Sequence, residues 1–403
     1  MIRTRKSRRQ GARIDPRFFI IIGVLVAVIG VLLFILLYNG KEEITDDGAM
    51  MFTLGERNAV LIRDEKVLIS SEYARLDYLR EEGAEVITGE KLATVYKLGY
   101  SDELMQSLLN AREDVYRAQM DRIGSTKDAR LDEMNDVIAG IRARIEDCVM
   151  TGNGENLEQL YWQLDSALKE RMEYLRGKVQ ETEALRALYK SADDKAALLE
   201  TWTETVYAPS YGVVSYYFDG YEEAMNAEKL SMLTPDLINR AVKDKGSAVW
   251  TTGDRTRACR VVDNERWFVA FLTKSGELTR TAEGVVYDVE IKGYGTYRGT
   301  ALDPIINGSQ VVNILEFDTD IGELLNVRTA SVKVSAAVSG IKVRSEALKI
   351  ENGVTYIELL RSESHVTMRV DVLAEKDGTA IIRPHEKNET LSPGVRYWNR
   401  KRR

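Results

Sequence analysis

The chain has 403 residues, of which 30% are charged, and its formal net charge is −7. This acidity argues against a nucleic-acid partner, because a phosphate backbone selects basic surfaces. The two cysteines, Cys148 and Cys259, fall in segments of different type, so they argue against a disulfide framework and supply too few soft ligands for a metal site.

Residues 18–38 predict a transmembrane helix. They carry no charge and are nearly all Ile, Val, Leu, Phe, Ala or Gly. As a helix they would span roughly 31 Å, about one hydrocarbon core. A cleaved signal peptide would have a shorter apolar core and a small-residue cleavage site. We therefore expect an uncleaved anchor.

The charges on either side of this segment set its orientation. Residues 1–17 form a basic tail with a net charge of +6, whereas the other side opens with several acidic residues. The positive-inside bias keeps the tail cytoplasmic and exports the rest of the chain. We expect a single-pass protein of the plasma or inner membrane, with its bulk outside the cytoplasm.

The segment after the anchor has the pattern of short strands. Apolar stretches at 59–62, 66–69, 85–87 and 92–95 alternate with turn residues, and Gly83 and Gly89 bracket one of them.

Residues 100–202 have a helical period. The segment 101–202 contains no proline, and narrow apolar stripes at 137–148 and 157–179 are typical of a coiled-coil seam. A turn signal at 151–156 separates the stripes. We expect an antiparallel hairpin with its tip there and arms of roughly 70 Å. Gly124 and Gly177 predict a joint in both arms, and a compact four-helix bundle is the alternative.

Strands return after Trp202. The segment 213–218 precedes an Asp-Gly turn, and 233–240 predicts a short helix with Thr234 as cap and Pro235 at its first position. Short strands without intervening helices then indicate antiparallel barrels or sandwiches. They are expected at 266–272, 285–291, 310–317, 330–335, 355–360, 366–372 and 379–383.

In this order the segments resemble the HlyD-like membrane-fusion, or periplasmic adaptor, proteins of secretion and efflux systems. The resemblance rests on the segments 83–92, 208–214, 264–270 and 340–348. It implies a mostly β fold with a long α-helical hairpin. The implied parts are leading strands (39–69), a lipoyl-like barrel-sandwich hybrid in two halves (70–99 and 203–232) around the hairpin (100–202), a β-barrel (233–336), a membrane-proximal β domain (337–398) and a basic tail (399–403).

Three features depart from the family pattern. The lysine-bearing turn of lipoyl and biotinyl domains is replaced by the helical insertion, so no cofactor is expected. The Arg, Leu and Ser pattern of a tip that docks an outer-membrane channel is not evident at 144–155, which makes a single-membrane bacterium plausible. Arg344 stands where many relatives have proline.

The sequence offers no catalytic or metal constellation. His365 and His385 are the only histidines, in a strand pattern and a turn, and both are expected to be packing or surface residues. Asp318-Thr-Asp320 lacks the spacing of a calcium loop and predicts a strand-end turn. Without a nucleophile–base set, we expect no enzyme.

Two candidate contact sites remain. The expected hairpin tip should bind a protein partner through Met150, Thr151, Asn153, Glu155 and Asn156. The C-terminal tail should contact anionic lipid headgroups. Its candidate residues are Trp398, Arg400, Lys401, Arg402 and Arg403.

The resemblance implies a non-catalytic adaptor that couples a membrane transporter, of the ATP-driven (ABC) type, to export across the envelope. Such adaptors often form homo-oligomeric rings. The alternative is a scaffold of the cell envelope or division apparatus that uses the same fold without a transporter.

Overall fold

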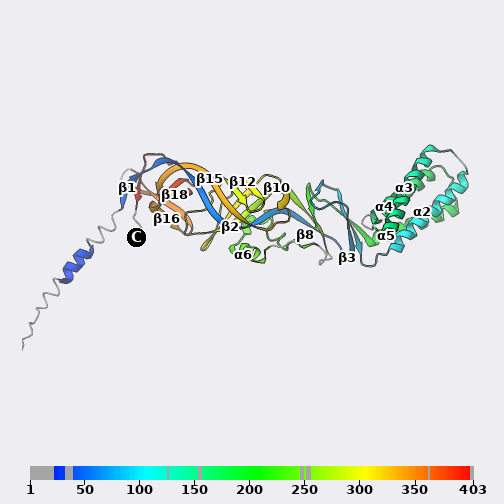
Figure 1. The fold of residues 1–403 in the computed structure, drawn as a ribbon, viewed down its shortest axis with the longest axis horizontal. Helices are drawn as coiled ribbons and strands as arrows, with labels where there is room; N and C mark the ends of the chain where they lie inside the picture. The colour runs from blue at the N-terminus through cyan, green and yellow to red at the C-terminus, as the bar shows by residue number, and fades with distance from the viewer. Residues whose placement is uncertain are drawn as a thin grey trace, which may run out of the picture.

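The computed structural model describes residues 22–31, 40–124, 127–152, 157–245, 249–250, 256–361 and 364–399. The described chain is elongated, with β1 and the C-terminus near one end and four helices at the other (Figure 1). Residues 22–31 of the expected anchor are helical. Its other residues lie outside the described part, and no described helix is long and apolar enough to cross a membrane.

The end that carries both termini is a small β-roll. Its strands are β1 (Lys41–Ile44), β20 (Arg396–Asn399), β17 (Val354–Arg361), β18 (Ser364–Lys376), β19 (Thr379–Pro384) and the end of β15 (Thr329–Arg344), with β16 (Leu348–Glu351) beside β17. The segment 41–47 closes the ring, because its first half pairs with β20 and its second half with β15. A core that includes Ile357, Leu359 and Val370 fills the roll.

The middle of the molecule is a closed six-stranded antiparallel barrel. Its strands are β2 (Asp46–Ile69), β10 (Arg257–Lys274), β14 (Gln310–Phe317), β12 (Gly295–Ala301), β11 (Val286–Ile291) and β15, which returns to β2. Exposed and buried residues alternate strictly in β11, because successive side chains point to the outside and the inside of the barrel. Trp267 stacks on Phe317 at 4.1 Å inside.

Shorter elements complete the barrel. These are β13 (Ile305–Asn307), η1 (Ala227–Met232), α6 (Pro235–Asp244), η3 (Gly322–Leu324) and η4 (Ser345–Ala347). Helix α6 packs on the outside of β2, β10 and β14. Thr234 accepts a hydrogen bond from the amide of Leu237, and Pro235 occupies the first turn, as the sequence indicates.

The barrel-sandwich module lies between the barrel and the helices. One sheet contains β3 (Tyr73–Tyr78), β5 (Lys91–Lys97) and β6 (Thr203–Tyr207). The other contains β4 (Glu85–Val86) and β7 (Gly212–Ser215), which continue onto β10, while β8 (Tyr217–Phe218) pairs with β9 (Val249–Trp250). Their shared core includes Leu92, Val95 and Val214.

Residues 102–202 form a compact four-helix bundle instead of a hairpin with 70 Å arms. The helices are α2 (Asp102–Ile123), α3 (Ala129–Thr151), α4 (Leu157–Arg176) and α5 (Glu183–Trp202). All four share one apolar core that includes Met105, Ile138, Leu164 and Leu199. Both arms break next to Gly124 and Gly177, where joints are expected, and α3 and α4 fold back onto α2 and α5. Each helix is therefore only about 33 Å long.

Two long strands also differ from the expected short ones. The segments 59–62 and 66–69 belong to the single strand β2, which runs from the roll through the barrel into the barrel-sandwich module. β2 is thus a common spine, a single strand shared by the roll, the barrel and the barrel-sandwich module. A change in register between Val262 and Trp267 lets β10 follow the same path.

Candidate functional site

The two halves of the barrel-sandwich module are joined through their backbones. The amide of Gly89 donates to the carbonyl of Ala208, and the amide of Ala208 donates to that of Glu90, both at 2.8 Å. At Gly212 (φ 155°) a Cβ would collide with the carbonyl of Val262, so only glycine permits this approach. The halves thus form one block from which the bundle leaves between β5 and β6.

The base of the bundle is fastened to this block by Arg75 on β3. Its guanidinium lies 2.7 Å from Glu158 at the start of α4 and over the rings of Tyr96 and Tyr100. The indole of Trp162 donates to the Tyr96 hydroxyl at 2.8 Å. Burial raises the pKa of Glu158, although Arg75 opposes this shift. The α3–α4 turn is therefore held at the base of the bundle.

Polar groups inside the bundle fix how its helices pack. Arg112 pairs with Asp165, and the amide of Gln119 donates both to the carbonyl of Met172 and to the hydroxyl of Tyr189. Both contacts between α2 and α4 have the same offset of 53 residues, which makes these helices parallel. Buried polar groups need such partners, so they favour this arrangement over a slipped one.

The free end of the bundle is formed by the α2–α3 and α4–α5 connections. Asp128 caps α3 and accepts hydrogen bonds from Lys178, at 2.6 Å, and from Tyr174. The hydrogen bond from Lys178 lowers the pKa of Asp128 to about 2. Beside this end, a groove of about 460 Å³ runs between α3 and α4, lined by Met134, Val137 and Ala167 among charged side chains.

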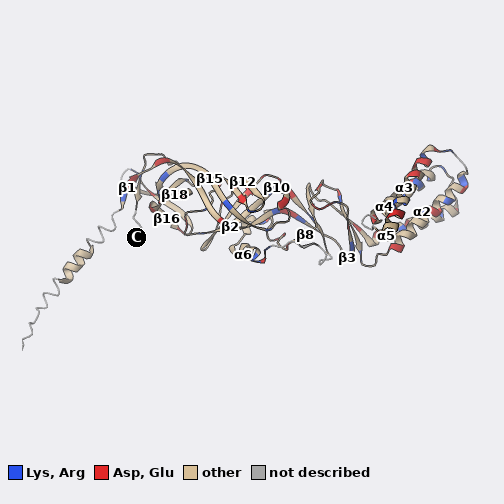
Figure 2. Cartoon of the chain, viewed as in Figure 1, with Lys and Arg blue, Asp and Glu red and all other residues tan. Residues whose placement is uncertain are grey.

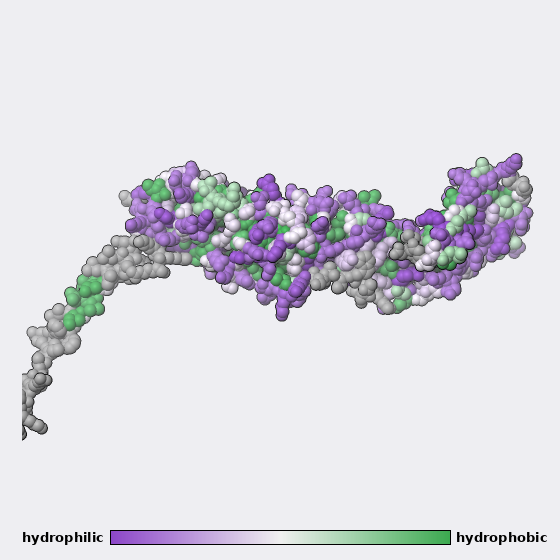
Figure 3. Space-filling view, viewed as in Figure 1, coloured by the Kyte–Doolittle hydropathy of each residue, from purple (hydrophilic) through white to green (hydrophobic). Residues whose placement is uncertain are grey.

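Two of the expected tip residues lie away from the free end. Met150 and Thr151 end α3 near the base, and the Met150 side chain is 81% exposed. Asn153, Glu155 and Asn156 lie outside the described residues. Basic and acidic residues alternate along the helices of the bundle (Figure 2), and the face of the molecule in Figure 3 is mostly hydrophilic with scattered hydrophobic residues.

A buried ionic cluster locks the module to the barrel. Glu65 accepts from Arg328 at 2.7 Å and also pairs with Arg260, while Asp219 accepts from Arg328 at 2.7 Å. Arg63 completes the cluster, and all five side chains are at most 2% exposed. Burial, together with Arg328, lowers the pKa of Arg63 to about 9. Sequence reasoning missed this cluster, although Arg63 and Arg260 each stand within an apolar strand pattern.

The candidate lipid-contact residues lie at the opposite end of the molecule. Trp398 is part of β20, pairs with Glu42 of β1 and stacks edge-on with His365 at 5.5 Å. Arg400, Lys401, Arg402 and Arg403 lie outside the described residues. β20 leads into the basic tail and pairs with β1, which is the first strand after the expected anchor.

The two histidines and two cysteines take part in local contacts. His365 contacts Glu358 at 2.7 Å, and His385 contacts Asp371 at 2.8 Å. Cys148 and Cys259 are free thiols, and burial raises the pKa of Cys259 to about 12. Within the described ranges, no three His, Cys, Asp or Glu side chains are grouped to hold a metal ion.

Solved structures give matches with low scores. ZneB from Cupriavidus metallidurans is 15% identical, with coverage of 90% of this chain and 92% of that one and a TM-score of 0.33. MacA from Actinobacillus actinomycetemcomitans is 12% identical over 88% and 98%, with a TM-score of 0.32. The membrane fusion protein Spr0693 from Streptococcus pneumoniae R6 is 14% identical over 71% and 99%, with a TM-score of 0.27.

Comparison with curated proteins finds no match. Residues 65–254 match the family model described as "RND related, barrel-sandwich hybrid domain". This range begins within β2 and covers both halves of the module and the whole bundle. The match of residues 65–254 to this family model thus confirms the resemblance to the membrane-fusion, or periplasmic adaptor, proteins.

Proposed function

We propose that the chain is a membrane-anchored, non-catalytic adaptor that couples a transporter of the cytoplasmic membrane to the extracytoplasmic space. The observation that carries this proposal is the family match over residues 65–254, a split barrel-sandwich module with a helical insertion. In this role the anchor fixes the height above the bilayer, and the β units form the body. The bundle presents the outer contact surface.

The arrangement of the described parts supports such a role. The roll holds β1, which follows the expected anchor, and the bundle lies at the far end of the elongated body (Figure 1). The common spine β2 and the buried ionic cluster connect the β units between these ends. A stiff body can hold a binding surface at a set distance from the membrane, which an adaptor requires.

We assign the outer contact to the groove between α3 and α4, near the free end of the bundle. It combines the apolar side chains of Met134 and Val137 with Glu133 and Glu170 at its rim. Protein interfaces commonly surround an apolar centre with a polar rim. The transporter partner is proposed to be of the ATP-driven type, and the adaptor to act as a homo-oligomer.

Photo-cross-linking in cells tests this function. A cross-linking residue at Glu133, in the groove, should capture an extracytoplasmic component of the export system, whereas the same residue at Arg298 on the barrel surface should not. Arg298 is a suitable control because its side chain is 79% exposed. Capture of division or peptidoglycan-associated proteins alone at Glu133 would contradict the transport role.

The envelope or division scaffold is the second candidate. One observation favours it: the start of α4 is held at the base of the bundle by Arg75 and Tyr96, and within the described residues no hairpin tip projects from the far end. Fluorescently tagged chain that gathers at the division site, without a co-purifying ATPase, would support the scaffold and reject the coupling role.

We further propose that the C-terminal tail contacts anionic headgroups. Its support is the pairing of β20 with β1. β20 is the strand before the tail, and β1 is the first strand after the expected anchor. Each basic residue near an anionic surface contributes about 1 kcal/mol. A chain that lacks both residues 1–38 and 400–403 should bind anionic liposomes more weakly than one that lacks only 1–38, and equal binding would exclude this contact.

A further inference from the structure

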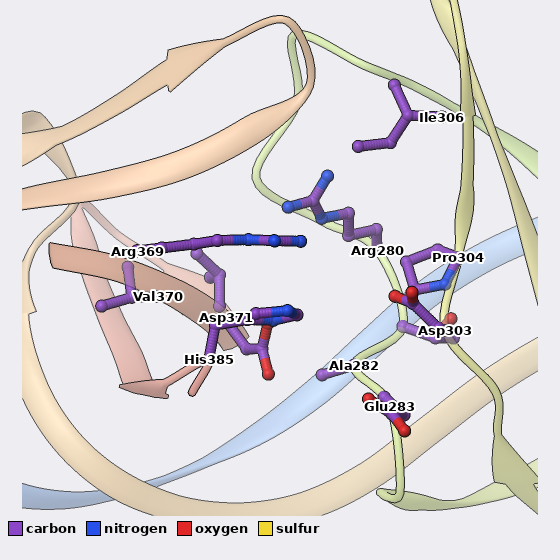
Figure 4. A pocket seen from close by; sticks show the side chains of 12 residues that line it. Arg280, Ala282, Glu283, Asp303, Pro304, Ile306, Arg369, Val370, Asp371 and His385 are labelled. Atoms are coloured by element: carbon purple, nitrogen blue, oxygen red, sulfur yellow. The ribbon is translucent and has the colours of Figure 1, made fainter. Parts of the chain in front are cut away.

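A pocket of about 170 Å³ lies between the barrel and the membrane-proximal roll. The segment after β10 supplies Arg280 and Glu283, and the segment before β13 supplies Asp303 and Pro304. From the roll, β18 supplies Arg369 and Asp371, and His385 follows β19. Figure 4 shows the guanidinium groups of Arg280 and Arg369 directed toward each other from these two sides.

The two arginines differ in their contacts but share one feature. Arg280 donates to the carbonyl of Gly353 and, at 3.5 Å, to the hydroxyl of Thr355. Within the described ranges neither Arg280 nor Arg369 forms an ion pair with a carboxylate, and the side chain of Arg369 makes no hydrogen bond. Like charges that face each other in a partly buried space repel, so this arrangement is unfavourable while the pocket holds only water.

Within the described residues, the acidic side chains of the pocket form no ion pair with Arg280 or Arg369. Asp371 accepts from Arg383 at 3.0 Å and contacts His385 at 2.8 Å, so its two oxygens are already engaged. Asp303 is exposed, and Glu283 is within ion-pairing distance of neither arginine. Burial lowers the pKa of Arg280 most and Arg369 lowers it further, although the charges of Asp371 and Asp303 oppose this shift.

We propose that this pocket binds a phosphate group, held between Arg280 of the barrel and Arg369 of the roll. A guanidinium presents paired N–H donors that match the oxygens of a phosphate, and two of them can hold one oxyanion from opposite sides. The volume lies below the roughly 300–1,000 Å³ of pockets for drug-sized ligands, so a single small group fits. The group would add a contact between two β units that share β2 and β15 and are also joined by the hydrogen bond from Arg280 to Gly353.

This proposal is independent of the adaptor role. The phosphate comes either from free inorganic phosphate or from a phospholipid headgroup, and the chemistry that recognises it is the same. Because the roll also carries the strand that follows the expected anchor, a headgroup is a reasonable source. The experiment must therefore contain one arm for each source.

Isothermal titration of the full-length chain in detergent with inorganic phosphate forms the first arm. The wild-type chain should bind saturably, and Arg369→Gln should weaken binding about tenfold or more, because hydrogen bonds to charged groups contribute that much. Arg369→Lys keeps the charge without the paired donors. Its affinity for phosphate should lie between those of the wild type and Arg369→Gln. Arg298→Gln removes an exposed barrel arginine and should bind as the wild type does.

Vesicles of phosphatidylcholine, with and without phosphatidylglycerol, form the second arm. Binding that depends on Arg369 but not on Arg298, without binding of free phosphate, assigns the pocket to a headgroup. Because the side chain of Arg369 makes no hydrogen bond in the described structure, Arg369→Gln should fold normally even if Arg280→Gln does not, and its unfolding midpoint checks this. If neither ligand binds, or if Arg369→Gln binds both as well as the wild type, the pocket is not a phosphate site.

Discussion

Arg63, Arg260 and Arg328 converge on the carboxylates of Glu65 and Asp219 at the junction of barrel and barrel-sandwich module. Further donors reach backbone carbonyls, such as that of Leu61 at 3.0 Å from Arg328, whereas Nε of Arg63 has no hydrogen-bond partner. Charges this deeply buried are stable only as a complete set, because each unpaired one keeps its desolvation cost. The cluster therefore acts as a specific lock, which tolerates the loss of no member.

Glu65→Gln should destabilise the protein by about 3–5 kcal/mol, since it leaves two arginines without their shared carboxylate. Urea denaturation followed by tryptophan fluorescence measures the change. Glu316→Gln is the control, because Glu316 pairs with Arg266 at the surface and should matter little. Equal midpoints for the two variants would show that the cluster does not lock the junction.

At the residue scale, the sequence indicated part of this cluster. Arg63 follows the apolar run Ala59–Ile62 and Arg260 lies among Ala258, Val261 and Val262, so both arginines interrupt a buried strand pattern. Their partners come from far along the chain, with Glu65 and Arg328 separated by 263 residues. Strand periodicity describes which face a residue takes but not which strand lies across from it.

At the element scale, the four helices depend on their connections. Asp128 caps α3 through the amides of Arg130 and Leu131, and it also binds Lys178 of the other connection. One carboxylate thus begins a helix and ties the two joints of the bundle together. The hydrogen bond from Lys178 holds its pKa near 2, well below the ordinary value of 3.8.

Asp128→Asn should lower the thermal midpoint of the bundle at pH 7 but not at pH 2. A depressed pKa contributes stability that is present above the unfolded value near 4 and is lost as the pH falls through the folded value near 2. Circular dichroism at 222 nm measures helix loss at both pH values. Asp132→Asn, in the first turn of α3, is the control, and a deficit that stays constant down to pH 2 would contradict the assignment.

The sequence predicted the helical segment, its turn signal and the two joints, but it left open whether the arms extend or fold back. The fold-back depends on contacts such as Trp162 with Tyr96 and Arg75 with Glu158, which join the helices to a β-sheet 66 and more residues away. Narrow apolar stripes are compatible with either a two-stranded seam or a small bundle. Heptad spacing alone cannot distinguish these packings.

Spin labels at Met150 and Glu72 distinguish the two arrangements in solution. An extended hairpin would place Met150 roughly 70 Å from the module. The bundle holds the end of α3 at its base, so the measured distance should be well under half of that. The labelled chain should carry Cys148→Ser, because Cys148 is only half-buried while Cys259 is buried. A dominant distance near the extended value would reject the closed bundle.

At the scale of the whole molecule, the β units are continuous with one another. β2 takes part in the roll, the barrel and the barrel-sandwich module, and β15 runs through two of them. The strands predicted from the sequence at 310–317 and 379–383 correspond to β14 and β19. The single strand β2, however, was predicted as several shorter strands. Apolar stretches interrupted by Arg63 and Asp64 look like separate strands, because the buried partners of the arginine are not visible in the sequence.

The helical bundle, by contrast, contacts the β body at its base, where the described helices meet the barrel-sandwich module. β5 leads into it and β6 leaves it, and Tyr96 pairs with Thr203 across the opening. The core of the barrel-sandwich module contains no residue of α2 to α5. The two halves of the module are also held together by β4 with β7 and by the Gly89–Ala208 hydrogen bond. The β body should therefore fold without the bundle.

Replacing residues 98–201 by Asn-Gly tests this independence. The register of β5 and β6 pairs Tyr96 with Thr203, so Lys97 and Trp202 would flank the new connection, and a two-residue Asn-Gly turn closes an antiparallel pair of this kind. The shortened chain should keep a cooperative thermal transition and a strand-type circular dichroism spectrum, with a lower midpoint because Tyr96 loses its contact with Trp162. It should also lose the cross-link from the α3–α4 groove, while phosphate binding between barrel and roll persists. A shortened chain that aggregates or melts without a transition would show that the helices are part of the folding unit, and that the split module depends on its insertion.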